Sequence, residues 1–290
     1  MIYTIENDKM KVSVNSHGAE LMSIKNSEGR EYLWQGDKKY WQDRAPILFP
    51  YIARLTDGKY YLDGKCYSMP IHGFASSSEF EVVEKNDLEI TFSLKSNKET
   101  YLCYPRKFEF LITYKLVETT LNIIFNVINE DEKVMYFGVG GHPGFLIDGK
   151  FDEYYLEFET ECEPIRVGFN DKCFLNGKDE KFPLVNNKIL MLNHKLFDND
   201  AIVLFDNAKT LTIKNNFDNY KLIVSYDKMK YLGLWHMPKT DAPYICIEPW
   251  SSLPSREGII EELEKQNNLI KLEKGENYIN AWSISICENK

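Results

Sequence analysis

The sequence predicts an all-β fold built from two large, stacked antiparallel sheets. Apolar and polar residues alternate with a period of two from end to end, which is the pattern of half-buried strands. Aromatic residues make up 14% of the chain, and Tyr and Phe favour strands, whereas helical patterns are few. No internal repeat or linker-like shift in composition divides the 290 residues, so we expect one domain spanning residues 1–290.

The predicted strands follow one another with short turns between them. Residues 11–14 and 20–24 are expected to form a first hairpin around residues 16–18. Residues 108–116 and 121–127 carry the clearest alternation and should lie as long antiparallel neighbours, each half buried. Further strands are predicted at 79–84, 88–94, 134–139, 154–159, 163–168, 201–205, 210–214, 220–226, 231–235, 244–248 and 282–287. Turns are marked by Asp63-Gly64, Asp148-Gly149 and Asn176-Gly177.

Two segments depart from the strand pattern. Residues 256–265 are predicted to form two helical turns, although Gly258 and a short apolar face weaken this helix. Residues 170–188 are polar and irregular, so we expect a long excursion over the surface.

Composition argues against several classes of partner. The net charge is -9 and no basic stripe is visible, which argues against nucleic-acid binding. No apolar run reaches the length of about 18 residues that a membrane-spanning helix needs, so no membrane partner is expected. The N-terminal residues 1–8 are too polar for a secretory signal. We therefore expect a cytoplasmic protein.

Cofactor and metal motifs are also missing from the sequence. The glycines at 138–144 are interrupted by a proline and do not open a helix, so they form no phosphate loop or dinucleotide fingerprint. None of the six cysteines forms a Cys-x-x-Cys pair, and no His-x-x-x-His pair occurs. We therefore expect no cofactor, no metal and reduced cysteines. His236 is expected in a packed wall among aromatics, and His17 and His194 in solvated turns.

Candidate chemistry concentrates where polar residues interrupt apolar strands. Four such stretches occur, at 44–54, 69–74, 140–145 and 244–250. In the third, His142 stands among glycines and a proline that stiffen the backbone and would present the imidazole in one direction. The glycines are expected to clear space for a ligand against the strand end. In isolation, a tight turn whose histidine caps a carbonyl is the more common arrangement.

Glu248 is the sharpest local anomaly, because it ends an otherwise apolar predicted strand. Burying a carboxylate costs free energy unless the group is paired or functional. Two interpretations stay open at this point, an ion pair, for instance with Arg54, and a catalytic carboxylate. Two interpretations also stay open for Trp250, which is either a core residue or a flat apolar face that binds a sugar ring.

Taken together, these stretches resemble the aldose 1-epimerase (galactose mutarotase-like) family, and most of all its lactose-operon-associated bacterial branch. The resemblance covers essentially the whole chain in order. Its motifs are Gly18-Ala19-Glu20-Leu21, Tyr32-Leu33-Trp34-Gln35-Gly36-Asp37, Arg54 after a proline-rich run, His72-Gly73-Phe74, Gly141-His142-Pro143-Gly144-Phe145 and Glu248-Pro249-Trp250. The family resemblance implies a large antiparallel β supersandwich and an enzyme that interconverts the α and β anomers of a free hexose without a cofactor.

The resemblance also assigns two catalytic roles. Glu248 matches the base that takes the proton from the C1 hydroxyl, and His142 matches the acid that protonates the ring oxygen. The ring then opens, the C1–C2 bond rotates, and the ring closes from the other face. His142 would have to start protonated while Glu248 is ionised.

Sugar-binding roles follow from the same resemblance. His72 and Arg54 match groups that hydrogen-bond and polarise the sugar, and Trp250 is expected beside it. Asp200 is the best match to an aspartate that binds sugar hydroxyls. Asp198 and Asp206 lie near enough in the sequence to stay as alternatives.

Three other functions remain as alternatives. Relatives that act on hexose 6-phosphates are expected to carry an arginine soon after the His-Gly-Phe motif, where this chain has Ser76, so an unphosphorylated aldose is favoured over a hexose-6-phosphate epimerase. A non-catalytic carbohydrate-binding or sensing domain would not need both Glu248 and His142. A glycoside hydrolase would need two carboxylates, and only Glu248 has such a setting. The protein is expected to be a monomer or homodimer.

Overall fold

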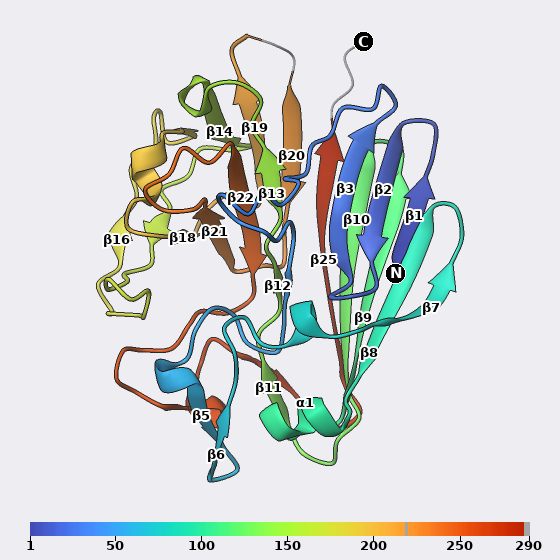
Figure 1. Cartoon of the computed structure of the whole chain (residues 1–290). Coiled ribbons are helices and arrows are strands. Elements are labelled where there is room, and N and C mark those ends of the chain that lie inside the picture. The colour runs from blue at the N-terminus through green and yellow to red at the C-terminus, as the bar shows by residue number, and fades with distance from the viewer. Residues whose placement is uncertain (218–219, 287–290) are drawn as a thin grey trace.

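Antiparallel sheets stacked in two layers form most of the computed structural model, which describes residues 1–217 and 220–286 (Figure 1). The largest sheet contains, in spatial order, β17 (Ile189–Met191), β14 (Tyr154–Phe158), β19 (Thr210–Asn215), β20 (Lys221–Ser225), β25 (Asn277–Ile286), β10 (Thr120–Asn129), β9 (Phe108–Val117), β8 (Glu89–Lys95) and β7 (Glu81–Lys85). The second sheet contains β16 (Glu180–Lys181), β15 (Ile165–Arg166), β18 (Ile202–Phe205), β21 (Tyr231–Trp235), β22 (Tyr244–Trp250), β12 (Gly140–Gly141) and β4 (Ile47–Leu48), and β13 (Gly144–Leu146) also pairs with β22.

Smaller sheets and short helices complete the layers. The small sheets are β1 (Ile2–Glu6), β2 (Met10–Asn15) and β3 (Glu20–Asn26); β23 (Glu261–Glu262), β5 (Lys59–Leu62) and β6 (Lys65–Ser68); and β11 (Met135–Phe137) with β24 (Ile270–Leu272). The helices are α1 (Lys98–Cys103) and the 3-10 turns η1 (Thr56–Gly58), η2 (Ala75–Ser77), η3 (Phe151–Glu153), η4 (His194–Phe197) and η5 (Leu263–Lys265).

The core lies between the largest sheet and the elements that cover one of its faces. Along β9, Phe108, Phe110, Ile112 and Tyr114 are buried while their neighbours are partly or fully exposed, so the predicted alternation is confirmed. The predicted pairing of β9 with β10 is confirmed as well. Figure 1 shows β1–β3 lying over β8–β10, and the Tyr3 and Phe92 rings meet there with centroids 5.9 Å apart.

Strand β22 is buried along its whole length, because both of its faces are covered. Ile245 and Ile247 point into the main core, and Cys246 belongs to a separate aromatic cluster on the opposite face. The prediction that the strand ends at Glu248 is wrong. The strand continues to Trp250, so Glu248 lies inside it.

The helix predicted at 256–265 is also wrong. Gly258 turns the chain with a φ of +70°, and β23 and η5 follow it. The Arg256 backbone N–H donates to Glu261 at 3.1 Å, and its guanidinium donates to the same carboxylate at 2.9 and 2.8 Å. These bonds hold the segment in an open loop, and a helical backbone here would break them.

Helix α1, in contrast, was not predicted, because its six residues are too few to show a helical period. Asn97 and Thr100 cap its N-terminus reciprocally.

The remaining predictions agree with the structure in most places. The first hairpin is formed by β2 and β3, and Asp63, Gly64, Gly149 and Gly177 have the positive φ of the predicted turns. The strand predicted at 163–168 is reduced to Ile165–Arg166, and Cys287 lies outside the described residues.

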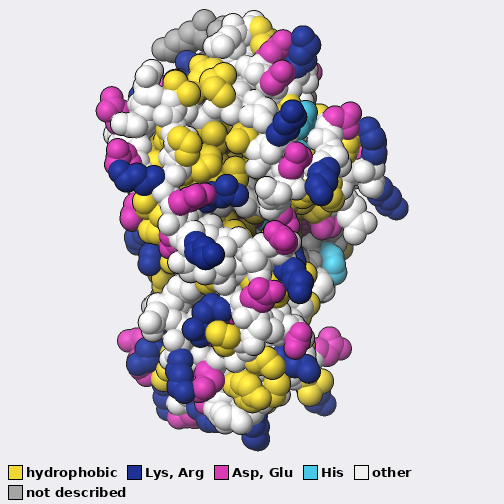
Figure 2. Space-filling view, turned by 90° about the vertical axis from the view of Figure 1, so that its left-hand side faces the viewer, with side chains coloured by type: hydrophobic (Ala, Val, Ile, Leu, Met, Phe, Trp, Pro, Cys, Tyr) yellow, Lys and Arg dark blue, Asp and Glu magenta, His cyan; other side chains and the backbone are white. Residues whose placement is uncertain are grey.

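Within the described part of the chain, no helix is long and apolar enough to cross a membrane. On the face shown in Figure 2, acidic and basic side chains are interspersed rather than gathered into a stripe of one sign.

Arg106 is the buried cation that ties the β5–β6 hairpin to the largest sheet. Its side chain is 2% exposed and donates to Asp63 at 3.0 and 3.2 Å. It also donates to the backbone carbonyls of Val134 and Pro105, at 2.6 and 2.8 Å. Lys133 reaches the same Asp63 carboxylate at 2.8 Å from the surface.

We predict that Arg106→Ala destabilises the protein by about 3 kcal/mol, because it leaves a cavity and buried carbonyls without donors. Lys133→Ala removes only the exposed partner and should leave the free energy of unfolding almost unchanged. Urea unfolding of both variants is the measurement. Equal losses from the two substitutions would contradict the role given to Arg106.

Candidate active site

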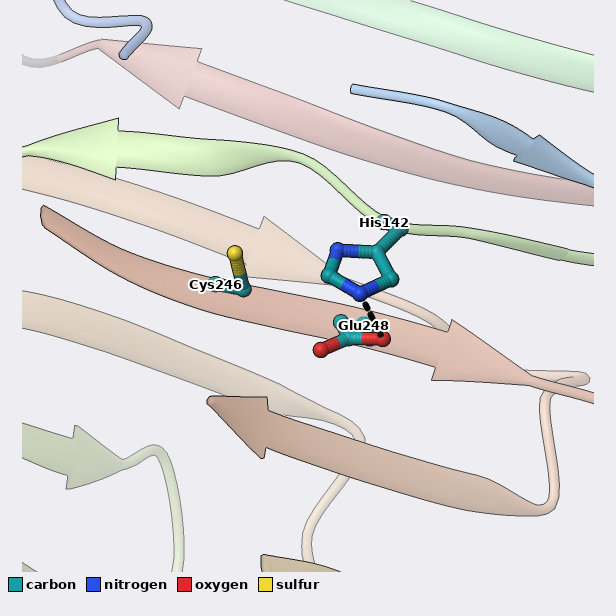
Figure 3. Close-up of side chains that lie close together, drawn as sticks. All are labelled: His142, Cys246 and Glu248. Carbon is teal, nitrogen blue, oxygen red and sulfur yellow. Dashed lines mark ion pairs between the residues drawn. The ribbon is translucent and has the colours of Figure 1, made fainter. Parts of the chain in front are cut away.

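His142 and Glu248 face each other across two antiparallel segments. Gly140 pairs with Trp250 and Gly144 pairs with Cys246, so the register places His142 directly opposite Glu248. The backbone N–H of His142 turns the other way and donates to the Pro46 carbonyl at 3.1 Å. Figure 3 shows the imidazole reaching from the segment between β12 and β13 towards the carboxylate on β22.

The pair is close and almost dry. His142 Nε2 lies 3.2 Å from Glu248 Oε2, and the two side chains are 11% and 1% exposed. Apart from this charge-pair contact, no group of the described residues makes a hydrogen bond of good geometry to the carboxylate oxygens or to His142 Nδ1. Glu248 forms no ion pair with Arg54 there, so the first alternative of the sequence analysis is replaced by a pair with His142. Buried polar atoms without partners are rare in proteins, and here they adjoin a cavity that a ligand can fill.

Burial shifts the two pKa values in opposite directions. It raises the pKa of Glu248 well above its usual value; the Asp200 charge adds to this shift, and the Trp250 indole N–H opposes it. Burial also lowers the pKa of His142 well below its usual value, and the neighbouring His72 lowers it further. Both shifts favour the uncharged groups. The two side chains therefore share one titratable proton, and burial favours that proton on the Glu248 carboxyl.

His72 is held in one orientation and one tautomer. Its φ is +64°, and its Nδ1 accepts a hydrogen bond from the Ala53 N–H at 3.1 Å. The neutral imidazole therefore carries its proton on Nε2. Burial first and the Arg54 charge second lower the pKa of His72 to about 4. At neutral pH, His72 is thus an uncharged donor whose ring lies 5.6 Å from that of His142.

A cavity of about 410 Å³ opens over the pair, a size within the usual range for small-molecule sites. Its lining includes all six site residues predicted from the sequence, namely His72, His142, Glu248, Arg54, Asp200 and Trp250. The two alternative aspartates, Asp198 and Asp206, are not among its lining residues. The structure therefore gathers the predicted residues around one space and distinguishes Asp200 from its neighbours.

Asp200 is positioned by a residue that the sequence analysis did not single out. Its Oδ2 accepts a hydrogen bond from the Cys173 thiol at 3.0 Å, and its Oδ1 accepts one from the Ala201 N–H at 3.0 Å. Burial first, and then Asp200, raise the pKa of Cys173 to about 12, so the thiol stays a donor. Cys173 belongs to the predicted surface excursion at 170–188. That segment is largely exposed, but this part of it lines the cavity.

Tryptophans form much of the cavity wall. The rings of Trp41 and Trp235 lie 5.0 and 5.6 Å from the His142 ring, and both line the cavity. The sequence analysis missed them as site residues, because aromatic residues are common throughout this chain.

The glycines beside His142 make room for tryptophans rather than leaving open space. A Cβ on Gly144 would lie 3.1 Å from both Trp34 and Trp41, and one on Gly140 would lie 3.1 Å from Trp250. The expectation of space cleared directly for a ligand is therefore corrected.

Gly233 plays a comparable part for the carboxylate. It faces Glu248 from β21, and a Cβ there would lie 3.0 Å from the Glu248 Cβ. Such a contact is tighter than ordinary packing, so a larger residue at position 233 would displace the Glu248 side chain. No signal in the sequence marked this position.

The other histidines lie outside the cavity. His194 is only partly exposed, where the sequence predicted a solvated turn; its Nδ1 lies 3.2 Å from Nε2 of the fully buried His236, and its ring stacks on Phe151. His236 packs among aromatics but does not line the cavity. His17 is exposed, as predicted, and faces Glu79 at 3.5 Å.

The chain is similar in sequence and in structure to known proteins. A sequence model described as aldose 1-epimerase matches residues 1–280. The chain is 36% identical over 265 residues to the chromosomal protein LacX of Lactococcus lactis subsp. lactis. This match covers 87% of this chain and 88% of LacX. A galactose mutarotase-like protein from Lactobacillus casei ATCC 334 superposes with a TM-score of 0.95 at 32% identity, over 99% of this chain and 100% of that one. A galactose mutarotase related enzyme from Lactobacillus acidophilus superposes with a TM-score of 0.94 at 32% identity, over 99% and 98%.

These similarities extend over nearly the whole chain, and the predicted galactose mutarotase-like β supersandwich is confirmed. The chain belongs to the aldose 1-epimerase family.

Proposed function

We propose that the protein is an aldose 1-epimerase that interconverts the α and β anomers of an unphosphorylated hexose. The observation that carries this proposal is the buried His142–Glu248 pair, 3.2 Å apart beneath a cavity that fits a monosaccharide. Membership of the family supports the same reaction class.

The reaction needs one proton in the right place at each step. A sugar C1 hydroxyl that donates to Glu248 stabilises the ionised carboxylate, and this moves the shared proton to His142. Glu248 then takes the hydroxyl proton while His142 protonates the ring oxygen, and the C1–O5 bond breaks. Rotation about C1–C2 and reclosure from the other face return both protons. The pair thereby avoids a free alkoxide, and each positioned transfer is worth roughly 10²–10⁴-fold in rate.

The rest of the cavity supplies groups that suit a sugar. The Nε2–H of His72 and the Arg54 guanidinium are donors, and the Asp200 carboxylate is an acceptor. The Trp250 and Trp41 side chains offer apolar surface to the C–H faces of a ring.

The charge of the cavity favours a substrate without a phosphate. Arg54 is its one lining cation within the described residues, whereas Asp43, Asp200 and Glu248 line it with carboxyl groups. Ser76 also lines the cavity where an arginine would provide a phosphate clamp. A phosphate dianion would therefore meet more repulsion than attraction.

We predict that the protein accelerates mutarotation of α-glucose or α-galactose, and that Glu248→Gln and His142→Asn each lower kcat by roughly 10²–10⁴-fold. Polarimetry on freshly dissolved sugar measures both rates. Glu79→Gln and His17→Asn are matched controls, because they alter an exposed Glu–His pair outside the cavity.

Two outcomes would argue against this assignment. If the wild type equilibrates both sugars only at the spontaneous rate, a non-catalytic sugar-binding role becomes the better explanation. Release of monosaccharide from a disaccharide would instead indicate hydrolysis.

We predict a bell-shaped dependence of kcat/KM on pH. The raised pKa of Glu248 and the lowered pKa of His142 leave one proton on the pair at intermediate pH. In acid both groups become protonated and no base remains; in alkali the shared proton is lost and no acid remains, so activity falls on both sides. Initial rates across the acid, neutral and alkaline ranges test this, and a rate that rises or falls throughout would contradict it.

We predict that kcat/KM for glucose exceeds that for glucose 6-phosphate by about tenfold or more, because the cavity lacks a phosphate clamp. Ser76→Arg should narrow this ratio by improving KM for the phosphate ester. Steady-state kinetics with both sugars is the measurement. A wild type that prefers the phosphate would show that another part of the chain binds it.

A further inference from the structure

Cys246 is a buried side chain beside the proposed acid/base pair that has no part in its chemistry. It lies two residues before Glu248 on β22, so both side chains point to the same face of the strand. Its cross-strand neighbour is Gly144, which has no side chain to come between Cys246 and His142. As a result, Sγ of Cys246, a ring nitrogen of His142 and a carboxylate oxygen of Glu248 all lie within 4.8 Å of one another (Figure 3).

We propose that Cys246, His142 and Glu248 form an inhibitory binding site for a thiophilic divalent cation such as Zn²⁺. The inhibitory consequence rests on the proposed function, whereas binding itself does not. Thiolate, imidazole and carboxylate are the donors that Zn²⁺ prefers, and three protein donors with one open position make a familiar coordination shell.

The geometry is close to that of a bound metal. Zinc bonds of about 2.0–2.3 Å in a tetrahedral arrangement place ligand atoms about 3.5 Å apart. His142 Nε2 and Glu248 Oε2 are already 3.2 Å apart, and no pair of donors exceeds 4.8 Å. Small side-chain rotations would therefore bring the three donors to bonding distance, and two of them, His142 and Glu248, line the cavity.

Two further observations favour a cation at this point. The Glu248 oxygens are buried and have no hydrogen-bond partner among the described residues, so a metal would satisfy them at little cost in lost hydrogen bonds. The carboxyl groups of Asp43 and Asp200 line the same cavity, which makes the entry path attractive to cations.

Metal binding would release protons. Burial raises the pKa of the Cys246 thiol, so the free protein holds it as S–H. On binding, the metal–sulfur bond forms as the thiol proton leaves to solvent, and any proton on Glu248 leaves as well. The affinity should therefore rise with pH. Ligation also occupies the lone pairs of both Glu248 and His142, so neither group could exchange a proton with a sugar.

The test uses Co²⁺ as a spectroscopic probe and Zn²⁺ as an inhibitor of the full chain. Wild type should show a near-ultraviolet thiolate-to-cobalt band that saturates at one metal per chain, and Zn²⁺ should compete it away. Cys246→Ala should abolish the band and raise the Zn²⁺ concentration for half-inhibition about tenfold or more, relative to its own activity without metal. Cys246→Ser keeps the side-chain volume and should lose the band as well, with circular dichroism reporting the fold of both variants.

Cys173→Ala is the matched control, because that thiol lies beside Asp200 in the same cavity. Its cobalt band should persist. The proposal is overturned if wild type shows no thiolate band, if the band survives in Cys246→Ala, or if only Cys173→Ala removes it. If the protein shows no mutarotase activity, the cobalt band still decides whether the metal site exists, so failure of the proposed function and failure of this site give different results.

Discussion

The antiparallel register between residues 140–146 and β22 is the constraint on which the candidate site depends. Gly140 opposite Trp250 and Gly144 opposite Cys246 leave His142 facing Glu248. A slip of one residue would turn every side chain of a strand to its other face and separate the two groups. Neighbours on both sides secure this register. Strand β4 pairs with Gly140 and Gly141, and β21 pairs along β22 with Gly233 opposite Glu248.

Burying this pair costs stability, and the surrounding fold offsets that cost elsewhere. Both groups are shifted towards their uncharged forms, so no isolated charge is left in the interior. Unpartnered polar atoms remain, however, and in a core they would be a defect. The sugar that we propose as substrate has enough hydroxyls to satisfy them. The same lack of partners would therefore add to the binding energy of the proposed sugar, as expected of a preorganised site.

The sequence predicted those parts of the site that local chemistry marks. Alternation gave β9 and β10, and a carboxylate in an apolar run drew attention to Glu248. Proline and glycine beside His142 showed that its backbone was constrained, but not that the glycines accommodate tryptophans, because that contact joins Gly144 to Trp34 and Trp41 across the fold. Cys173 and Gly233 were missed for the same reason, since each matters through a residue remote in sequence. The helix at 256–265 was predicted wrongly because helix propensity is assigned residue by residue and contains no information about the hydrogen bonds between Arg256 and Glu261.

Cys246 is a residue that suits the packing of its surroundings and also has a side chain that can bind a metal ion. Its side chain belongs to an apolar cluster with Trp34 and Tyr244. A serine there would bury a hydroxyl in need of a partner, and an alanine would leave a small void, whereas a protonated cysteine behaves as a compact hydrophobe. Packing alone therefore explains a cysteine at this point. Its neighbours change what that cysteine can do, because the imidazole and carboxylate that we propose for proton transfer are also common metal ligands. The buried, closely spaced arrangement that suits the proposed acid/base chemistry therefore also suits, with one thiol added, the proposed metal coordination.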